Sequence, residues 1–121
     1  MEQKKTLVLG ATNNPARYAY LAANRLVAAG HEIVNIGIKN GEVAGVPIRR
    51  AADVLSDIHT ITLYIGPQRQ PQYYDYISQT KPQRIIFNPG TENPELKALA
   101  EQQGIEVVEA CTLVLLSTGQ Y

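Results

Sequence analysis

The sequence offers one group of residues suited to binding an anion, directly after its first apolar run at residues 6–9. A turn of small residues follows that run, and Asn14-Pro15 is a typical cap and first residue of a helix. Unpaired backbone N–H groups and the positive end of a helix attract phosphate. Arg17 could add a bidentate contact from the first helical turn, or it could be an ordinary solvated arginine. We therefore predict a phosphate-binding loop made of Gly10, Ala11, Thr12, Asn13 and Asn14.

A second residue suited to phosphate is Lys39, which follows the apolar run at residues 32–36. The three-glycine fingerprint of dinucleotide-binding domains is absent, because the turn keeps only Gly10. Such domains also place a carboxylate near the end of the second strand to bind the ribose of NAD, where this chain has Lys39. These two departures favour a nucleotide with an extra ribose phosphate, either coenzyme A or NADP. The alternative is that Lys39 is an ordinary loop lysine.

No arrangement typical of catalysis or of metal binding is evident. His31 and His59 precede predicted strands, whereas chemistry in open α/β sheets occurs where strands end, so we interpret both as structural. Cys111 opens a short apolar helix whose dipole could lower its thiol pKa, although we favour a small buried residue there. Glu92 and Glu109 lie near strand ends, but no histidine, lysine or metal-binding cluster accompanies them. We expect no catalytic residue and no metal ligand.

These residues must be positioned by an alternation of strands and helices. Apolar runs predict five strands, at residues 6–9, 32–36, 60–65, 84–87 and 106–108. Helical patterns lie at residues 15–29, 70–79, 94–104 and 111–117. Residues 37–57 are expected to form an irregular, exposed crossover in which residues 49–55 resume a short helix.

Regular alternation of this kind predicts an α/β fold. Parallel neighbours need crossover connections, and both faces of the sheet need covering. We therefore expect one domain over residues 1–121, a Rossmann-like, doubly wound, mostly parallel five-stranded sheet in a three-layer α/β/α arrangement. The phosphate loop favours a central first strand.

Composition narrows the classes of partner. The 121 residues include 11 basic and 11 acidic side chains, so no net charge favours nucleic acid or an anionic membrane. A single cysteine excludes an internal disulfide and fits a reducing compartment. No secretory signal is evident, and no apolar run approaches the roughly 20 residues that span a bilayer. We expect a cytoplasmic protein that binds neither nucleic acid nor a membrane.

Four segments, in this order and spacing, resemble the CoA-binding domain of the α-subunit of succinyl-CoA synthetases and of small stand-alone CoA-binding proteins. The resemblance covers nearly the whole chain and implies a ligand of coenzyme A or an acyl-CoA. The segments are the turn at residues 10–14, Gly37-Ile38-Lys39-Asn40-Gly41, Gly45-Val46-Pro47-Ile48 with Ala51-Ala52-Asp53-Val54, and Tyr64-Ile65-Gly66-Pro67.

The resemblance also implies a role for each matching position. Residues 10–13 would wrap the pyrophosphate, Lys39 would lie near the ribose phosphate, and Ile36 and Gly37 would border the adenine. The adenine and pantetheine side would be lined by Ile65, Gly66 and Pro67. The pantetheine arm would meet Asn88, Pro89 and Gly90. Independently of the resemblance, the rule that ligands bind at the carboxyl ends of strands could bring Cys111, which follows the last predicted strand, near the terminal thiol of the ligand.

We therefore expect non-catalytic binding of coenzyme A or an acyl-CoA, in a carrier, sensor or subunit role. The synthetase passes phosphate through a histidine in a separate ligase domain, which this chain lacks. The alternatives are a small NADP-dependent reductase and an interaction subunit of an acyl-CoA ligase. The sequence is compatible with a homo-oligomer and with binding to a partner enzyme subunit.

Overall fold

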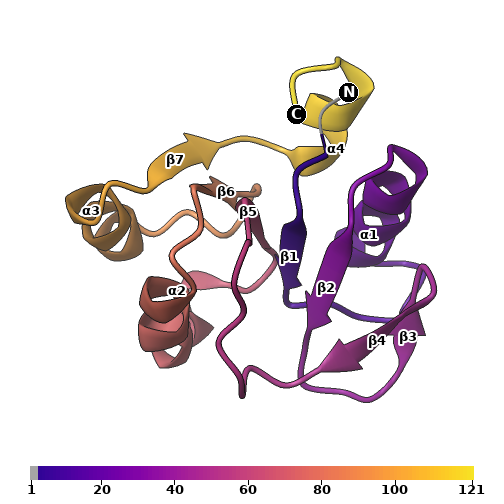
Figure 1. Cartoon of the computed structure of the whole chain (residues 1–121), viewed down its shortest axis with the longest axis horizontal. Coiled ribbons are helices and arrows are strands. Elements are labelled where there is room, and N and C mark those ends of the chain that lie inside the picture. Colours follow the sequence, from indigo (N-terminus) through magenta and orange to yellow (C-terminus); the bar gives the residue numbers. More distant parts are fainter. Residues whose placement is uncertain (1–2) are drawn as a thin grey trace.

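A seven-stranded sheet forms the centre of the computed structural model, which describes residues 3–121 (Figure 1). The strand order is β3-β4-β2-β1-β5-β6-β7, and every neighbouring pair is parallel except β3 with β4. The strands are β1 (Thr6–Leu9), β2 (Ile33–Ile36), β3 (Glu42–Val43), β4 (Val46–Arg49), β5 (Thr60–Leu63), β6 (Arg84–Phe87) and β7 (Glu106–Glu109).

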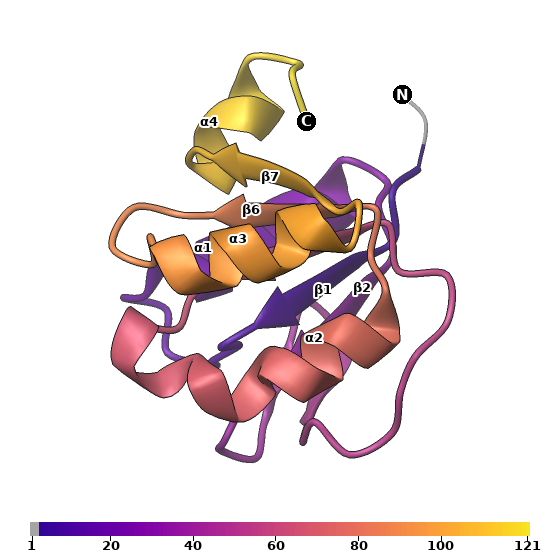
Figure 2. The same ribbon diagram turned by 90° about the vertical axis from the view of Figure 1, so that its left-hand side faces the viewer.

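Helices pack on both faces of this sheet. Successive residues of a strand point to opposite faces, so Leu7 and Leu9 of β1 belong to one apolar cluster and Val8 to the other. Helices α2 and α3 contribute to the first cluster and α1 and α4 to the second, and Figure 2 shows α2 and α3 on the near side of the sheet. The helices are α1 (Tyr18–Ala28), α2 (Tyr74–Thr80), α3 (Pro94–Gln102) and α4 (Thr112–Ser117), with 3-10 turns at Pro67–Arg69 and Pro71–Tyr73.

The Rossmann-like α/β class is confirmed, whereas the predicted number of five strands is wrong. The two extra strands, β3 and β4, form an antiparallel hairpin at one edge of the sheet. Its turn residues Ala44 and Gly45 have positive φ of 55° and 79°, as a tight hairpin turn requires. Asn35 of β2 holds the hairpin, since its Nδ2 donates to the carbonyls of Val43 and Val46 at 3.2 and 3.1 Å.

The short helix expected at residues 49–55 is also wrong. Arg49 is the last residue of β4 and pairs with Ile36 of β2, so the backbone there is extended. Residues 50–57 contain no helix. The hydrophobic pattern did not predict β4 because this strand is short and Ile48 is its only buried residue.

Two helix starts differ from the expectation, and a third is confirmed. Helix α1 begins at Tyr18 with Arg17 as its cap, because Asn14 closes a separate turn by accepting from the Ala16 N–H at 3.0 Å. Helix α2 begins only after two prolines have imposed 3-10 turns. Asn93 caps α3 as expected, accepting from the N–H groups of the next turn.

A buried polar cluster occupies the amino ends of the strands. The Tyr121 ring is 4% exposed, its hydroxyl bonds that of Thr6, and the Arg84 guanidinium lies 4.5 Å from the ring centroid. Arg84 Nε donates to Thr60 Oγ1 at 3.0 Å. His31 packs 4.9 Å from the same ring and accepts a backbone N–H at Nδ1. This end of the sheet is therefore closed by packing.

Candidate functional site

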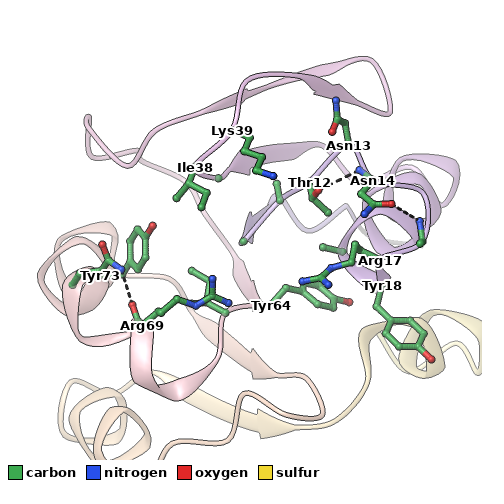
Figure 3. A pocket seen from close by; sticks show the side chains of 17 residues that line it. Thr12, Asn13, Asn14, Arg17, Tyr18, Ile38, Lys39, Tyr64, Arg69 and Tyr73 are labelled. Atoms are coloured by element: carbon green, nitrogen blue, oxygen red, sulfur yellow. Dashed lines mark hydrogen bonds between the residues drawn. The ribbon is translucent and has the colours of Figure 1, made fainter.

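A cleft of about 780 Å³ opens at the carboxyl ends of β1, β2 and β5 (Figure 3). Strand β1 pairs with β2 on one side and β5 on the other. The chain runs outward from β1 to β2 and later returns to β5, so the strand order reverses at β1. Ligands of open α/β sheets bind in the crevice at such a switch point.

The loop after β1 forms the floor of the cleft. Its first two N–H groups, of Gly10 and Ala11, both donate to the Ile36 carbonyl at 2.9 Å. The N–H groups of Thr12 and Asn13 have no hydrogen-bond acceptor among residues 3–121. Two backbone donors are therefore free for an anion in the predicted phosphate loop.

Glycines let three loops meet beneath the cleft. A Cβ on Gly10, whose φ is +100°, would lie 2.9 Å from the carbonyl carbon and oxygen of Tyr64. A Cβ on Gly37 would lie 2.4 Å from the Ala11 carbonyl oxygen. The close approach that requires these glycines is thus between backbones. At these two positions the loops after β1, β2 and β5 are in close backbone contact.

The β3–β4 hairpin anchors the loop that carries Lys39. The N–H of Gly37 donates to the Arg49 carbonyl at 2.9 Å, and that of Ile48 to the Gly41 carbonyl at 2.8 Å. Arg50 adds a side-chain bond from Nη1 to the Gly37 carbonyl at 3.2 Å. The unexpected hairpin therefore fixes both ends of this loop.

Three cations from three different elements line the cleft. Arg17 caps α1, Lys39 follows β2, and Arg69 ends the 3-10 turn after β5. Figure 3 shows all three side chains directed toward the cleft. None of them forms a side-chain hydrogen bond or an ion pair with residues 3–121, and no Asp or Glu is among the residues that line the cleft. The positive field is therefore local and unneutralised.

Apolar and aromatic side chains complete the walls. Ile38 is 66% exposed at the rim, and Tyr73 is half-buried on another wall. Burial raises the pKa of Tyr64 to about 12, with the hydroxyls of Thr112 and Thr62 acting in the opposite direction. Tyr64 is thus a neutral phenol at physiological pH. The cleft can hold an anion that carries apolar groups.

The structure brings together most of the predicted binding residues and leaves others outside. Ile36 is buried and does not line the cleft, and its carbonyl accepts from the Gly10 and Ala11 N–H groups. Gly66 and Pro67 follow the lining residue Ile65 but do not line the cleft themselves. The role of all these residues in binding stays a prediction. Those that line the cleft are Gly10, Ala11, Thr12, Asn13, Asn14, Arg17, Gly37, Lys39 and Ile65.

The predicted pantetheine contacts lie outside the cleft. Asn88 is buried, and its Nδ2 donates to Thr62 Oγ1 at 2.7 Å and to the Leu63 carbonyl at 2.8 Å. Its Oδ1 accepts from the Thr112 N–H at 2.9 Å, so the amide ties β6 to β5 and α4. Pro89 and Gly90 are exposed beside it, and Cys111 is half-buried as the cap of α4.

Sequence reasoning missed eight of the 17 residues that line the cleft. Arg69 and Tyr73 follow the carboxyl end of β5, and the rule that ligands bind at strand ends could have found them. Tyr64 is the first residue beyond that strand. The missed lining residues are Ala16, Tyr18, Ala19, Ile38, Tyr64, Arg69, Gln72 and Tyr73.

Residues 3–121 contain neither a metal-binding cluster nor a membrane-spanning helix. No group of three His, Cys, Asp or Glu side chains there could hold a metal ion. No helix in that part of the chain is long and apolar enough to cross a bilayer.

A parallel sheet with a cation-lined cleft at its switch point is typical of nucleotide-binding α/β domains. Within that class, the chain belongs to the CoA-binding domain family, whose profile matches residues 4–117. The match confirms the resemblance drawn from the sequence.

Solved structures agree with this fold. One, of an uncharacterized protein, is 52% identical, with a TM-score of 0.97 over 100% of both chains. A Thermus thermophilus protein is 20% identical, with a TM-score of 0.85 over 98% of this chain and 91% of its own. A hypothetical protein from Pyrococcus horikoshii OT3 is 23% identical, with a TM-score of 0.85 over 96% and 82%. The last two show the fold alone, and no curated protein is a match.

Proposed function

We propose that this protein binds coenzyme A or an acyl-CoA in the cleft, without catalysing a reaction, as a carrier, sensor or enzyme subunit. One observation carries the proposal. In a chain of the CoA-binding domain family, Arg17, Lys39 and Arg69 line the same cleft as Thr12 and Asn13, whose backbone N–H groups are free.

The chemistry of coenzyme A fits this arrangement. Its pyrophosphate and ribose phosphate are concentrated negative charge, which cations and backbone N–H groups bind by charge-assisted hydrogen bonds. Its adenine and acyl-bearing arm need apolar contacts, which Ile38, Tyr64 and Tyr73 offer. The cleft volume of about 780 Å³ also lies in the usual range for cofactor sites, roughly 300–1,000 Å³.

The lining supports binding without catalysis. His, Cys, Asp and Glu are absent from the residues that line the cleft. The Tyr64 phenol, with its pKa of about 12, is a poor general base near neutral pH. We infer a protein that presents or senses its ligand.

Native mass spectrometry of the protein purified from cells tests the proposal, because it reports which nucleotide travels with the chain. Calorimetry with coenzyme A, acetyl-CoA and NADP then ranks the ligands. We expect coenzyme A or its thioester to bind most tightly. Tight binding of NADP without binding of coenzyme A would favour the small reductase instead.

A further inference from the structure

A buried glutamine follows Arg69 and fixes the turn that carries it. Gln70 is 1% exposed, and its Nε2 donates to the carbonyls of Ile65 and Thr91 at 2.9 and 2.8 Å. Its Oε1 accepts from Asn93 Nδ2 at 2.9 Å. Moving this amide would leave buried donors and acceptors unpaired, which is strongly unfavourable. The turn after β5 is therefore tied to the loop after β6.

The backbone of Arg69 is held while its side chain is not. Its N–H donates to the Gly66 carbonyl at 3.0 Å, and its carbonyl accepts from Gln72 Nε2 at 3.1 Å. Its guanidinium, which Figure 3 shows directed into the cleft, has no hydrogen-bond or ion-pair partner in residues 3–121. A fixed backbone that carries an unpaired guanidinium is suited to binding a phosphate. Only the side chain must be ordered on binding, so the entropy cost is small.

The segment that leads to Arg69 packs against the phosphate loop. A Cβ on Gly10 would meet the Tyr64 carbonyl and Ile65 Cγ1 at 2.9 Å, so the two loops are in contact. Lys39 approaches from β2, on the other side of β1. Arg69 and Lys39 therefore come from opposite sides of β1 and line the same cleft as Thr12 and Asn13.

We propose that Arg69 binds the pyrophosphate of the ligand and that Gln70 is a positioning residue that aims it. The inference rests on the proposed function, because it assigns a phosphate of the same nucleotide. In this proposal the loop after β6 does not contact the ligand. It supports Gln70 instead, through the hydrogen bonds of Thr91 and Asn93.

Calorimetry with coenzyme A and dephospho-CoA tests the assignment, because both ligands carry the pyrophosphate and only the first carries the ribose phosphate. Arg69→Gln should weaken both ligands by the same factor, about 10- to 100-fold. Arg69→Lys keeps the positive charge and loses the bidentate geometry of the guanidinium. Its affinities should lie between those of the wild type and those of Arg69→Gln. Arg25→Gln, on the last turn of α1 and outside the cleft, should change neither affinity.

A double-mutant cycle tests the positioning role. Gln70→Met keeps the length of the side chain and removes its hydrogen bonds. It should weaken coenzyme A in the wild-type background and have no further effect in the Arg69→Gln background. A merely structural role would instead lower binding in both backgrounds. Should Gln70→Met fail to fold, the Arg69 variants still decide the assignment.

Each result separates this inference from the proposed function. Wild-type protein that binds no CoA-type ligand would remove the proposed function, and this assignment with it. Wild-type protein that binds both ligands, with unchanged affinities in Arg69→Gln, would overturn the assignment alone. A loss confined to coenzyme A would move Arg69 to the ribose phosphate and would also overturn it.

Discussion

At the scale of residues, the site depends on charges that the protein leaves unpaired. Arg17, Lys39 and Arg69 face a cleft that no carboxylate lines. Lys39 and the loop at residues 10–14 could be predicted from the sequence, because each follows a strand that its own apolar run reveals. Arg69 also follows a visible strand, and the rule that ligands bind at strand ends could have found it. The buried amide of Gln70 that fixes its turn could not be predicted, since its partners at positions 65, 91 and 93 come together only in the fold.

The ribose phosphate provides a prediction for Lys39. Wild-type protein should bind coenzyme A about 10- to 100-fold more tightly than dephospho-CoA, because one charge-assisted contact is lost with the phosphate. Lys39→Met should bring the two affinities together. Calorimetry measures both, and a preference that survives in Lys39→Met would assign the ribose phosphate to another cation.

The close approach at Gly37 provides a second prediction. Gly37→Ala places a Cβ 2.4 Å from the Ala11 carbonyl oxygen, and overpacking of this kind lowers the free energy of unfolding by about 1–3 kcal/mol. Gly66→Ala is the control, because the nearest atom there, at 3.0 Å, is the tip of an exposed glutamine side chain. Chemical denaturation compares the two, and equal stabilities would show that the loops can move apart.

At the scale of elements, apolar runs in the sequence predicted strands correctly, whereas the two strands with few apolar residues were not predicted. The strands β1, β2, β5, β6 and β7 are visible because each carries at least two apolar residues within four. The hairpin of β3 and β4 is not, since its six residues include few buried side chains and its stability comes from Asn35 and from pairing with β2. It is nevertheless the element that fixes the loop bearing Lys39.

Asn93 provides a prediction for an element and its connections. Asn93→Ala removes the cap of α3 and the hydrogen bonds to Gln70 and to the Tyr74 hydroxyl. The free energy of unfolding should fall by about 2–4 kcal/mol, the sum of a lost cap and an unpaired buried amide. Asn24→Ala, at an exposed position within α1, should change it by less than about 0.5 kcal/mol. Thermal or urea unfolding of both proteins provides the comparison.

At the scale of the whole molecule, the two ends of the sheet differ in character. The carboxyl ends of the strands carry the open cleft. The amino ends carry the buried cluster of Thr6, His31, Thr60, Arg84 and Tyr121, in which polar groups bond one another. The sequence predicted the ligand-binding end, because the rule for ligands is general. It did not predict the buried cluster, because Tyr121 is remote in sequence from Thr6, His31 and Arg84.

Tyr121 should contribute much of the global stability. Tyr121→Ala removes a ring that is 4% exposed, together with its bond to Thr6, and should lower the free energy of unfolding by about 3–5 kcal/mol. Tyr18→Ala removes an aromatic ring that is 71% exposed and should have a small effect, below about 0.5 kcal/mol. Urea denaturation distinguishes them, and equal effects would contradict the role of the cluster.

His31 makes this cluster sensitive to acid. Burial, followed by the positive charges of Lys4 and Arg84, lowers the pKa of His31 below its ordinary 6.5. The unfolded chain therefore binds a proton at a higher pH than the folded chain does. The free energy of unfolding should be constant above pH 6.5 and should decrease as the pH falls from 6.5 toward the folded pKa. Urea midpoints measured between pH 7.5 and pH 5, about the range where histidine titrates, should show this decrease, and His31→Gln should lack it.

The separation of the two ends has a consequence for how such a chain can diverge. A four-residue strand, about 13 Å long, lies between the cations of the cleft and the cluster around Tyr121. Substitutions more than about 7–10 Å apart without shared partners act independently. Under the proposed function, exchanging Lys39 or Arg69 for other side chains would alter which ligand is accepted while the anchoring end keeps the chain folded. Descendants of one ancestral sequence can acquire different ligands by single steps, each of which still yields a folded protein.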